Sequence, residues 1–216
     1  MKSKFKILII LPILAMLISC ESIQSISGIE TGSDVSAKAQ IKSDEFVPPH
    51  LVFNDYQVIS INASEIEIDN RYDMPHALPH IEHFFPISLE ITIKNLIDSK
   101  LLALGQENKL KVIIDDLSVV KEKLPEDTSF IGTFRKFPTH VLKSRIVMRF
   151  ELVDANRPDV ILGHSTLVAK RDRHIVDDMS ISEKEHAYYQ LTEDLVDDVY
   201  KGFADTVQKY FGMKEF

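Results

Sequence analysis

Several residue types that mark common protein classes are scarce in this 216-residue sequence. Its single cysteine excludes an internal disulfide and a zinc site built on several thiolates. Its 7 glycines form no phosphate-binding loop, and no serine lies in the Gly-x-Ser-x-Gly motif of hydrolases. The formal net charge of −8 argues against a nucleic-acid partner, because phosphate binding requires a basic surface. We therefore expect no enzymatic activity, no cofactor and no bound nucleic acid.

The first twenty residues have the order of a secretory signal. Lys2, Lys4 and Lys6 precede an unbroken apolar run from Ile7 to Ile18. A helix that spans a bilayer needs about 20 apolar residues, so this run is too short to cross one comfortably. A positively charged start followed by a short apolar run is typical of a signal peptide.

The next residues point to a lipid anchor. Leu17-Ile18-Ser19-Cys20 resembles the lipobox of bacterial lipoproteins. The resemblance implies that residues 1–19 are removed and that Cys20, the new first residue, is acylated and holds the chain to a membrane. Glu21 after the cysteine resembles the default for outer-membrane sorting, where an aspartate would imply retention in the inner membrane. The resemblance implies an envelope location facing the periplasm. An ordinary signal peptide or short anchor with a coincidental cysteine is the alternative.

The mature chain divides into a tether and a domain. Residues 20–45 are rich in Ser, Gly, Lys and Gln and have no sustained hydrophobic period, which predicts a flexible tether. Random-coil scaling gives such a segment a reach of about 25 to 30 Å. Residues 46–216 have the composition of one globular domain.

The first half of the domain is predicted as strand, loop and helix. Residues 51–68 alternate like a strand but change phase, which indicates a bulge or two abutting strands. Three prolines predict a loop over residues 71–86. Apolar residues at helical spacing then run from Leu89 to Leu104, with Ser88 as N-cap and Gly105 as terminator.

The second half is predicted as three strands and a long helix. Residues 109–121 alternate with a slip at Asp115-Asp116, whose side chains we expect on opposite faces. Residues 140–153 and 160–171 predict a hairpin. A capping box of Ser182 with Glu185, or of Ser180 with Glu183, begins a helix to about residue 211. Its polar face, which we expect to be solvated, carries Glu193, Asp194, Asp197, Asp198 and Asp205.

The resulting order predicts an α+β fold of two layers, β-α-β-β-β-α, with two amphipathic helices on one face of a mostly antiparallel sheet. This order resembles auxiliary lipoproteins of lipid transporters, the lipopolysaccharide-assembly lipoprotein and the N-terminal domain of the Tol-system periplasmic protein. A second resemblance is to a family of uncharacterised proteobacterial lipoproteins without established catalytic residues. It rests on residues 81–86, 110–119, 149–154 and 182–191.

A histidine-rich loop is the first candidate site. His76, His80, Glu82 and His83 supply the nitrogen and oxygen donors that zinc, copper or nickel prefers. The alternative is a solvent-exposed loop whose His83-Phe84-Phe85 end packs at the start of the following helix.

An aromatic and basic loop is the second candidate. Phe130, Phe134, Arg135 and Phe137 are suited to contact a protein partner or a lipid headgroup surface. The alternative is that these rings fold back onto the core.

Two functions therefore stand beside each other. The first is a lipid-anchored, non-catalytic envelope protein that acts through protein contacts, as an accessory or scaffold in envelope assembly or transport. The second is a metal-binding or small-ligand-binding lipoprotein that uses the histidine-rich loop.

Overall fold

The computed structural model describes residues 45–125 and 137–212. These residues belong to the second of two units into which the chain divides, Ser43–Phe216. The predicted signal peptide, Cys20 and nearly all of the tether lie outside the described residues.

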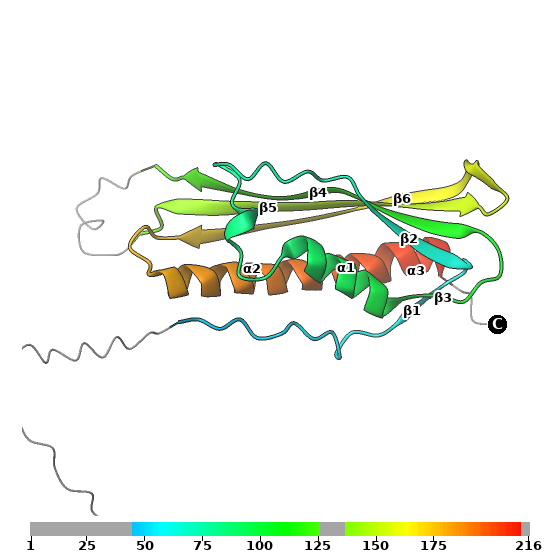
Figure 1. The fold of residues 1–216 in the computed structure, drawn as a ribbon, viewed down its shortest axis with the longest axis horizontal. Coiled ribbons are helices and arrows are strands. Elements are labelled where there is room, and N and C mark those ends of the chain that lie inside the picture. The colour runs from blue at the N-terminus through cyan, green and yellow to red at the C-terminus, as the bar shows by residue number, and fades with distance from the viewer. Residues whose placement is uncertain (1–44, 126–136, 213–216) are drawn as a thin grey trace, which may run out of the picture. The chain divides into compact units, whose positions relative to one another are not determined.

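A four-stranded sheet forms one layer (Figure 1). Its order is β2-β4-β5-β6, with parallel pairing between β2 and β4 and antiparallel pairing elsewhere. The strands are β2 Glu65–Asn70, β4 Lys109–Lys123, β5 His140–Asp154 and β6 Arg157–Ile175. The predicted hairpin of β5 and β6 is confirmed.

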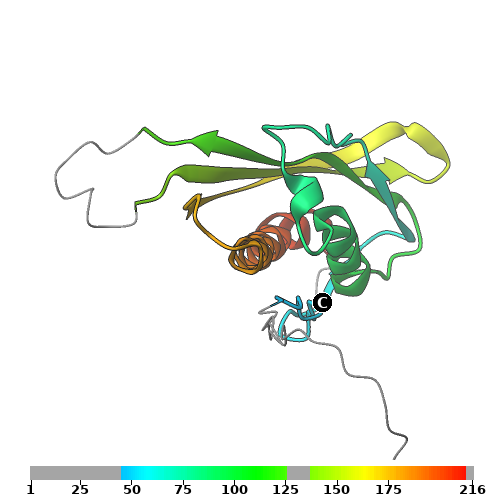
Figure 2. The same ribbon diagram turned by 60° about the vertical axis from the view of Figure 1, so that its left-hand side comes forward.

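Both long helices cover the same face of this sheet, as Figure 2 shows. They are α1, Leu89–Lys100, and α2, Ile181–Gly202. The sheet residues beneath them alternate with exposed ones, because successive side chains of a strand point to opposite faces. Buried examples are Leu110, Val112, Ile146, Met148 and Phe150. The predicted two-layer α+β fold is confirmed.

The first predicted strand is two strands in different sheets. β1, Ile59–Ile61, pairs in parallel with a short strand β3, Leu101–Ala103. β2 instead joins the four-stranded sheet. The phase change in the sequence marks the point where the chain passes from one sheet to the other.

Helix α1 ends before its predicted terminus. Ser88 caps it as predicted, through a hydrogen bond from the Ile91 N–H to Oγ. The helix stops at Lys100 because the next three residues pair with β1. Gly105 does not end the helix. Its N–H instead donates to the Ala63 carbonyl, just beyond the pairing of β3 with β1. A Cβ there would lie 2.6 Å from the Ala63 nitrogen, so only glycine fits the close approach.

Helix α2 begins with the second of the two predicted capping boxes. The Ser180 Oγ accepts from the Glu183 N–H, and the Glu183 carboxylate accepts from the Ser180 N–H. The Ser182 box is therefore wrong, because Ser182 already lies inside the helix. The helix continues through a π-helical segment, η2, Phe203–Val207, into α3, Gln208–Phe211.

An extended arm, residues 45–58, precedes β1 and packs on the helices. The Phe46 ring meets the rings of His186 and Tyr189 edge-on, at 5.1 and 5.7 Å. Further along, the Tyr56 and Tyr200 rings stack at 4.2 Å. The arm therefore follows α2 from its first turns to its last. Among the described residues, no helix is long and apolar enough to cross a membrane.

Candidate functional site

The histidine-rich loop lies along a part of the β4 edge that β2 leaves uncovered. The Ile81 N–H donates to the Val119 carbonyl at 3.0 Å, and the Lys121 N–H donates to the Pro79 carbonyl at 2.9 Å. β2 pairs with β4 only as far as Ile114. The backbone of the loop therefore forms hydrogen bonds with β4 beyond the point where β2 ends.

Glu82 is the buried centre of this loop, with 5% of its surface exposed. Its Oε1 accepts from the Tyr72 hydroxyl at 2.8 Å and from the Val119 N–H at 2.6 Å, and His80 Nδ1 lies 3.1 Å away. Burial, together with the bond to Glu82, raises the pKa of Tyr72 well above its usual value. Glu82 Oε2 is buried and has no hydrogen-bond partner in the described part of the chain.

The four predicted metal ligands do not converge. Glu82 and His80 contact each other, whereas the His76 and His83 rings lie together with centroids 5.7 Å apart. Within residues 45–125 and 137–212, no three side chains of His, Cys, Asp or Glu are close enough to share a metal ion. The structure therefore does not assemble the predicted metal site. At the end of the loop, Phe85 packs at the start of α1 and stacks on Tyr188 at 5.0 Å.

Of the second candidate loop, only Phe137 lies within the described residues, and 38% of its surface is exposed. Phe130, Phe134 and Arg135 lie outside them, so their predicted role stays a prediction. The same holds for the lipidation of Cys20.

A β-bulge places two carboxylates on one face of the sheet. The β4–β5 register shifts between Ile114 and Asp116, so Asp115 is an extra residue. Asp115 Oδ2 lies 2.6 Å from Arg149 Nε, and Asp116 pairs with Arg145. Arg145 and Arg149 share the helix-free face of β5, so the expectation of opposite faces is wrong. The Arg149 hydrogen bond lowers the pKa of Asp115.

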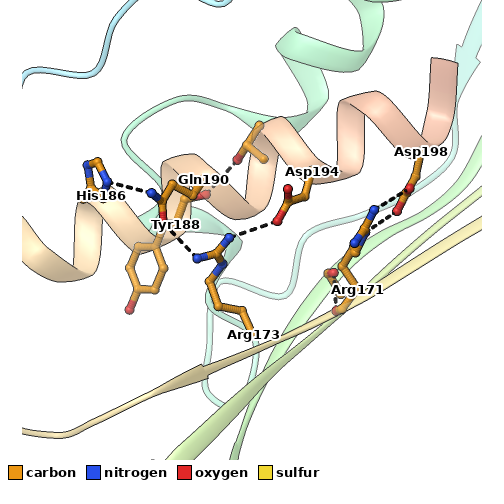
Figure 3. Close-up of polar contacts among 9 residues, drawn as sticks. Arg171, Arg173, His186, Tyr188, Gln190, Asp194 and Asp198 are labelled. Carbon is orange, nitrogen blue, oxygen red and sulfur yellow. Dashed lines mark hydrogen bonds and ion pairs between the residues drawn. The ribbon is translucent and has the colours of Figure 1, made fainter. Parts of the chain in front are cut away.

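Ion pairs join α2 to β6 along one side of the helix layer (Figure 3). Arg171 binds Asp198, and Arg173 binds both Gln190 and Asp194. The hydrogen bonds that Arg171 donates to the Asp198 carboxylate raise the pKa of Arg171. The prediction that this face of the helix is simply solvated is wrong at Asp194 and Asp198. No signal in the sequence identifies the two arginines as partners, because the pairs span 21 and 27 residues.

A groove lies at the start of α2, where the arm meets the helix. We call it the α2 groove; its volume is about 820 Å³. Its lining residues are Glu45, Phe46, Pro48, Pro86, Ser180, Ile181, Ser182 and Glu185. Ile181 is 76% exposed, and neighbouring Val47 is 78% exposed. The sequence analysis did not single out this place, since its parts are far apart in the chain.

Comparisons with known proteins give structural neighbours only. No family model matches the chain, and no curated protein matches it. The fold is similar to that of a minor lipoprotein from Acinetobacter baumannii, with a TM-score of 0.40 and 11% identity over 72% of this chain and 99% of that one. It is also similar to the rare lipoprotein B from Shewanella oneidensis, with a TM-score of 0.36 and 7% identity over 67% and 95%. A lipoprotein from Caulobacter crescentus has a TM-score of 0.27 and 10% identity over 65% and 90%. These neighbours are bacterial lipoproteins.

Proposed function

We propose that the chain is a lipid-anchored protein of the bacterial outer membrane that faces the periplasm. It acts without catalysis, as an accessory or scaffold in envelope assembly or transport. The N-terminal order of lysines, apolar run and Ser19-Cys20 is the observation that carries this proposal. A cysteine thiolate is the nucleophile that takes a lipid. Each buried methylene of the acyl chains contributes about 0.8 kcal/mol, so several chains make a lasting anchor.

The helix-free face of the sheet supports action through protein contacts. Charged residues on this face pair with one another, as Asp115 does with Arg149 and Glu122 with Lys143. Between them Val147 lies opposite Val168, which is 50% exposed. An exposed valine surrounded by charged side chains that already have partners resembles the apolar centre and polar rim of a protein interface.

Replacement of Cys20 tests the anchor. In Cys20→Ala we expect no incorporation of labelled palmitate and an accumulation of unprocessed precursor, because the thiol that receives the lipid is gone. The matched control Ser22→Ala should be labelled and processed normally. Normal processing of Cys20→Ala would contradict the lipobox assignment.

Chemical crosslinking in intact cells tests the partner role. We expect the purified full chain to carry another envelope protein, and Val168→Asp to reduce that adduct without changing the amount of folded chain. Recovery of uncrosslinked monomer alone would contradict the accessory role.

A further inference from the structure

We propose that the α2 groove binds a segment of a partner protein in which an apolar side chain is flanked by lysine or arginine. This inference rests on the proposed function in one respect, namely that the domain acts through protein contacts. It adds the place of one contact and the chemistry of the segment that fits there.

Apolar side chains on three parts of the chain face this groove. Phe46 and Pro48 come from the arm, Pro86 from the loop before α1, and Ile181 from the first turn of α2. Phe46 is held against α2 by its ring contacts with His186 and Tyr189. Ile181 points outward with most of its surface exposed. Covering this side chain with a partner's apolar group removes it from water, which favours binding.

Two carboxylates at the groove give it a charge preference. Glu45 and Glu185 both line the groove, and neither takes part in an ion pair within the described chain. Carboxylates on the sheet differ in this respect, since Asp115 and Glu122 each have a basic partner. Opposite charges across an interface steer association and select the partner. Lysine or arginine beside the apolar anchor supplies the complement.

The helix N-terminus does not reverse this preference. An uncapped N-terminus attracts anions because its first N–H groups lack partners. Here the Glu183 N–H donates to Ser180, and the Glu183 carboxylate already lies at the helix start. Lys184 is in the same turn but does not line the groove. An acidic partner would be repelled by Glu45 and Glu185 and would find the N-cap of α2 already occupied by Ser180 and Glu183.

A protein segment fits this site better than a bilayer. Peripheral binding to an anionic membrane relies on basic residues beside the apolar ones. Glu45 and Glu185 next to Ile181 oppose that binding.

Tryptophan fluorescence tests the proposal directly, because the chain has no tryptophan of its own. Ile181→Trp places a single reporter in the groove of the full chain in detergent micelles. The probe is a synthetic peptide of leucine and lysine, and its control is a peptide of leucine and glutamate of equal length. Tyr210→Trp is the matched reporter, since Tyr210 is 61% exposed and does not line the groove.

We expect the lysine peptide to shift the emission of Ile181→Trp to shorter wavelength and to leave Tyr210→Trp unchanged. Glu45→Lys with Glu185→Lys should weaken the binding at least tenfold, and added salt should weaken it as well. Equal binding of the glutamate peptide, or binding that survives the charge reversal, would overturn the proposal. Circular dichroism checks folding, and Ser182→Trp, at another residue that lines the groove, is a second reporter if Ile181→Trp does not fold.

Two further arms separate the alternatives. The full chain reconstituted in vesicles of phosphatidylethanolamine and phosphatidylglycerol should show no such shift without peptide. A shift there would assign the groove to lipid and overturn the proposal. Peptide binding should persist in Cys20→Ala, so failure of the anchor assignment leaves this test intact.

Discussion

Arg171 on β6 and Asp198 on α2 form a two-point contact. The Arg171 Nη2 donates to Asp198 Oδ1 at 2.8 Å, and its Nε donates to Oδ2 of the same carboxylate. This planar geometry fixes both the distance and the rotation of the helix relative to the strand. The two side chains are 42% and 24% exposed, so water screens part of their attraction.

A double-mutant cycle on Arg171→Ala and Asp198→Ala should give a coupling of about 1 kcal/mol in the free energy of unfolding, because the pair is bidentate and partly shielded. The coupling should fall at high salt. Lys201 and Asp197 provide a matched control on the same helix, with 65% and 40% exposure. Their coupling should be smaller, because water screens both of these more exposed side chains. Equal coupling for both pairs would contradict this account.

The two capping serines should differ in their effect on stability. Ser180→Ala removes the acceptor of the Glu183 N–H and should cost about 1 kcal/mol of unfolding free energy. Ser182→Ala, inside the helix, should change it by less than about 0.5 kcal/mol. Urea unfolding followed by circular dichroism measures both. A larger loss in Ser182→Ala would mean that α2 begins two residues later.

Buried Glu82 should matter more to stability than an exposed glutamate. Glu82→Ala leaves the Val119 N–H and the Tyr72 hydroxyl without their acceptor, at a cost of about 2 to 3 kcal/mol. Glu82→Gln keeps one acceptor oxygen and should lose less. Glu90→Ala, which breaks an exposed pair with Lys94, is the control and should lose under about 0.5 kcal/mol.

The same Glu82 substitution should lower the pKa of Tyr72, because the glutamate contributes to its upward shift. Ultraviolet titration of the tyrosines follows this change. The pKa of Tyr72 should still remain above its usual value, since burial is the larger cause.

Acid should remove part of the stability that Asp115 provides. Arg149 holds the pKa of Asp115 below its ordinary value of 3.8 in the folded chain. The contribution is therefore complete above that value and is lost as the pH falls through the lower, folded pKa. We expect about 1 kcal/mol or less, because Arg149 is 36% exposed. Asp115→Asn should flatten the unfolding free energy below pH 3.8 relative to wild type, and an unchanged acid profile would contradict the ion pair.

The arm should open when its contact with α2 is weakened. The Tyr200 hydroxyl accepts from the Gln57 N–H at 2.8 Å and donates to the Gln57 carbonyl at 3.2 Å. Tyr200→Phe removes both bonds but retains the ring that stacks on Tyr56. Chymotrypsin should then cut the arm after Phe53 or Tyr56 several times faster. Tyr210→Phe is the control, and equal rates in both variants would contradict the role of the hydroxyl.

The local periodicity of the sequence predicts most of the helices and strands of this fold. It fails where pairing with a segment far away in the chain determines the secondary structure. The alternation in residues 140–153 identifies β5, and the change of phase near Asp115 identifies the bulge. The end of α1 could not be predicted in this way. Leu101 continues the helical spacing, yet residues 101–103 pair with β1, some forty residues earlier in the chain.

The candidate sites show the same division. Glu82 is predicted as a site residue because histidines lie beside it in the sequence. Its hydrogen bonds with Val119 and Tyr72 could not be predicted, because neither residue is its neighbour in the chain. The helical pattern predicts that the Asp198 side chain is solvated. Its partner Arg171 lies 27 residues away in the chain and comes close only in the folded structure. The α2 groove could not be predicted because the arm, Pro86 and the helix start meet only in three dimensions.

The docked arm has a consequence for how a membrane anchor would hold the domain. With Phe46 beside His186 and Tyr56 beside Tyr200, the arm covers about 20 Å of the α2 axis. The chain toward Cys20 therefore departs near the first turn of α2. Detachment of the arm as far as Gln57 would move that departure point to the opposite end of the helix. About a dozen more residues would then lie between Cys20 and the fixed part of the domain. The ring contacts of Phe46 and Tyr56 would thus decide at which end of α2 an anchored chain is attached to the domain.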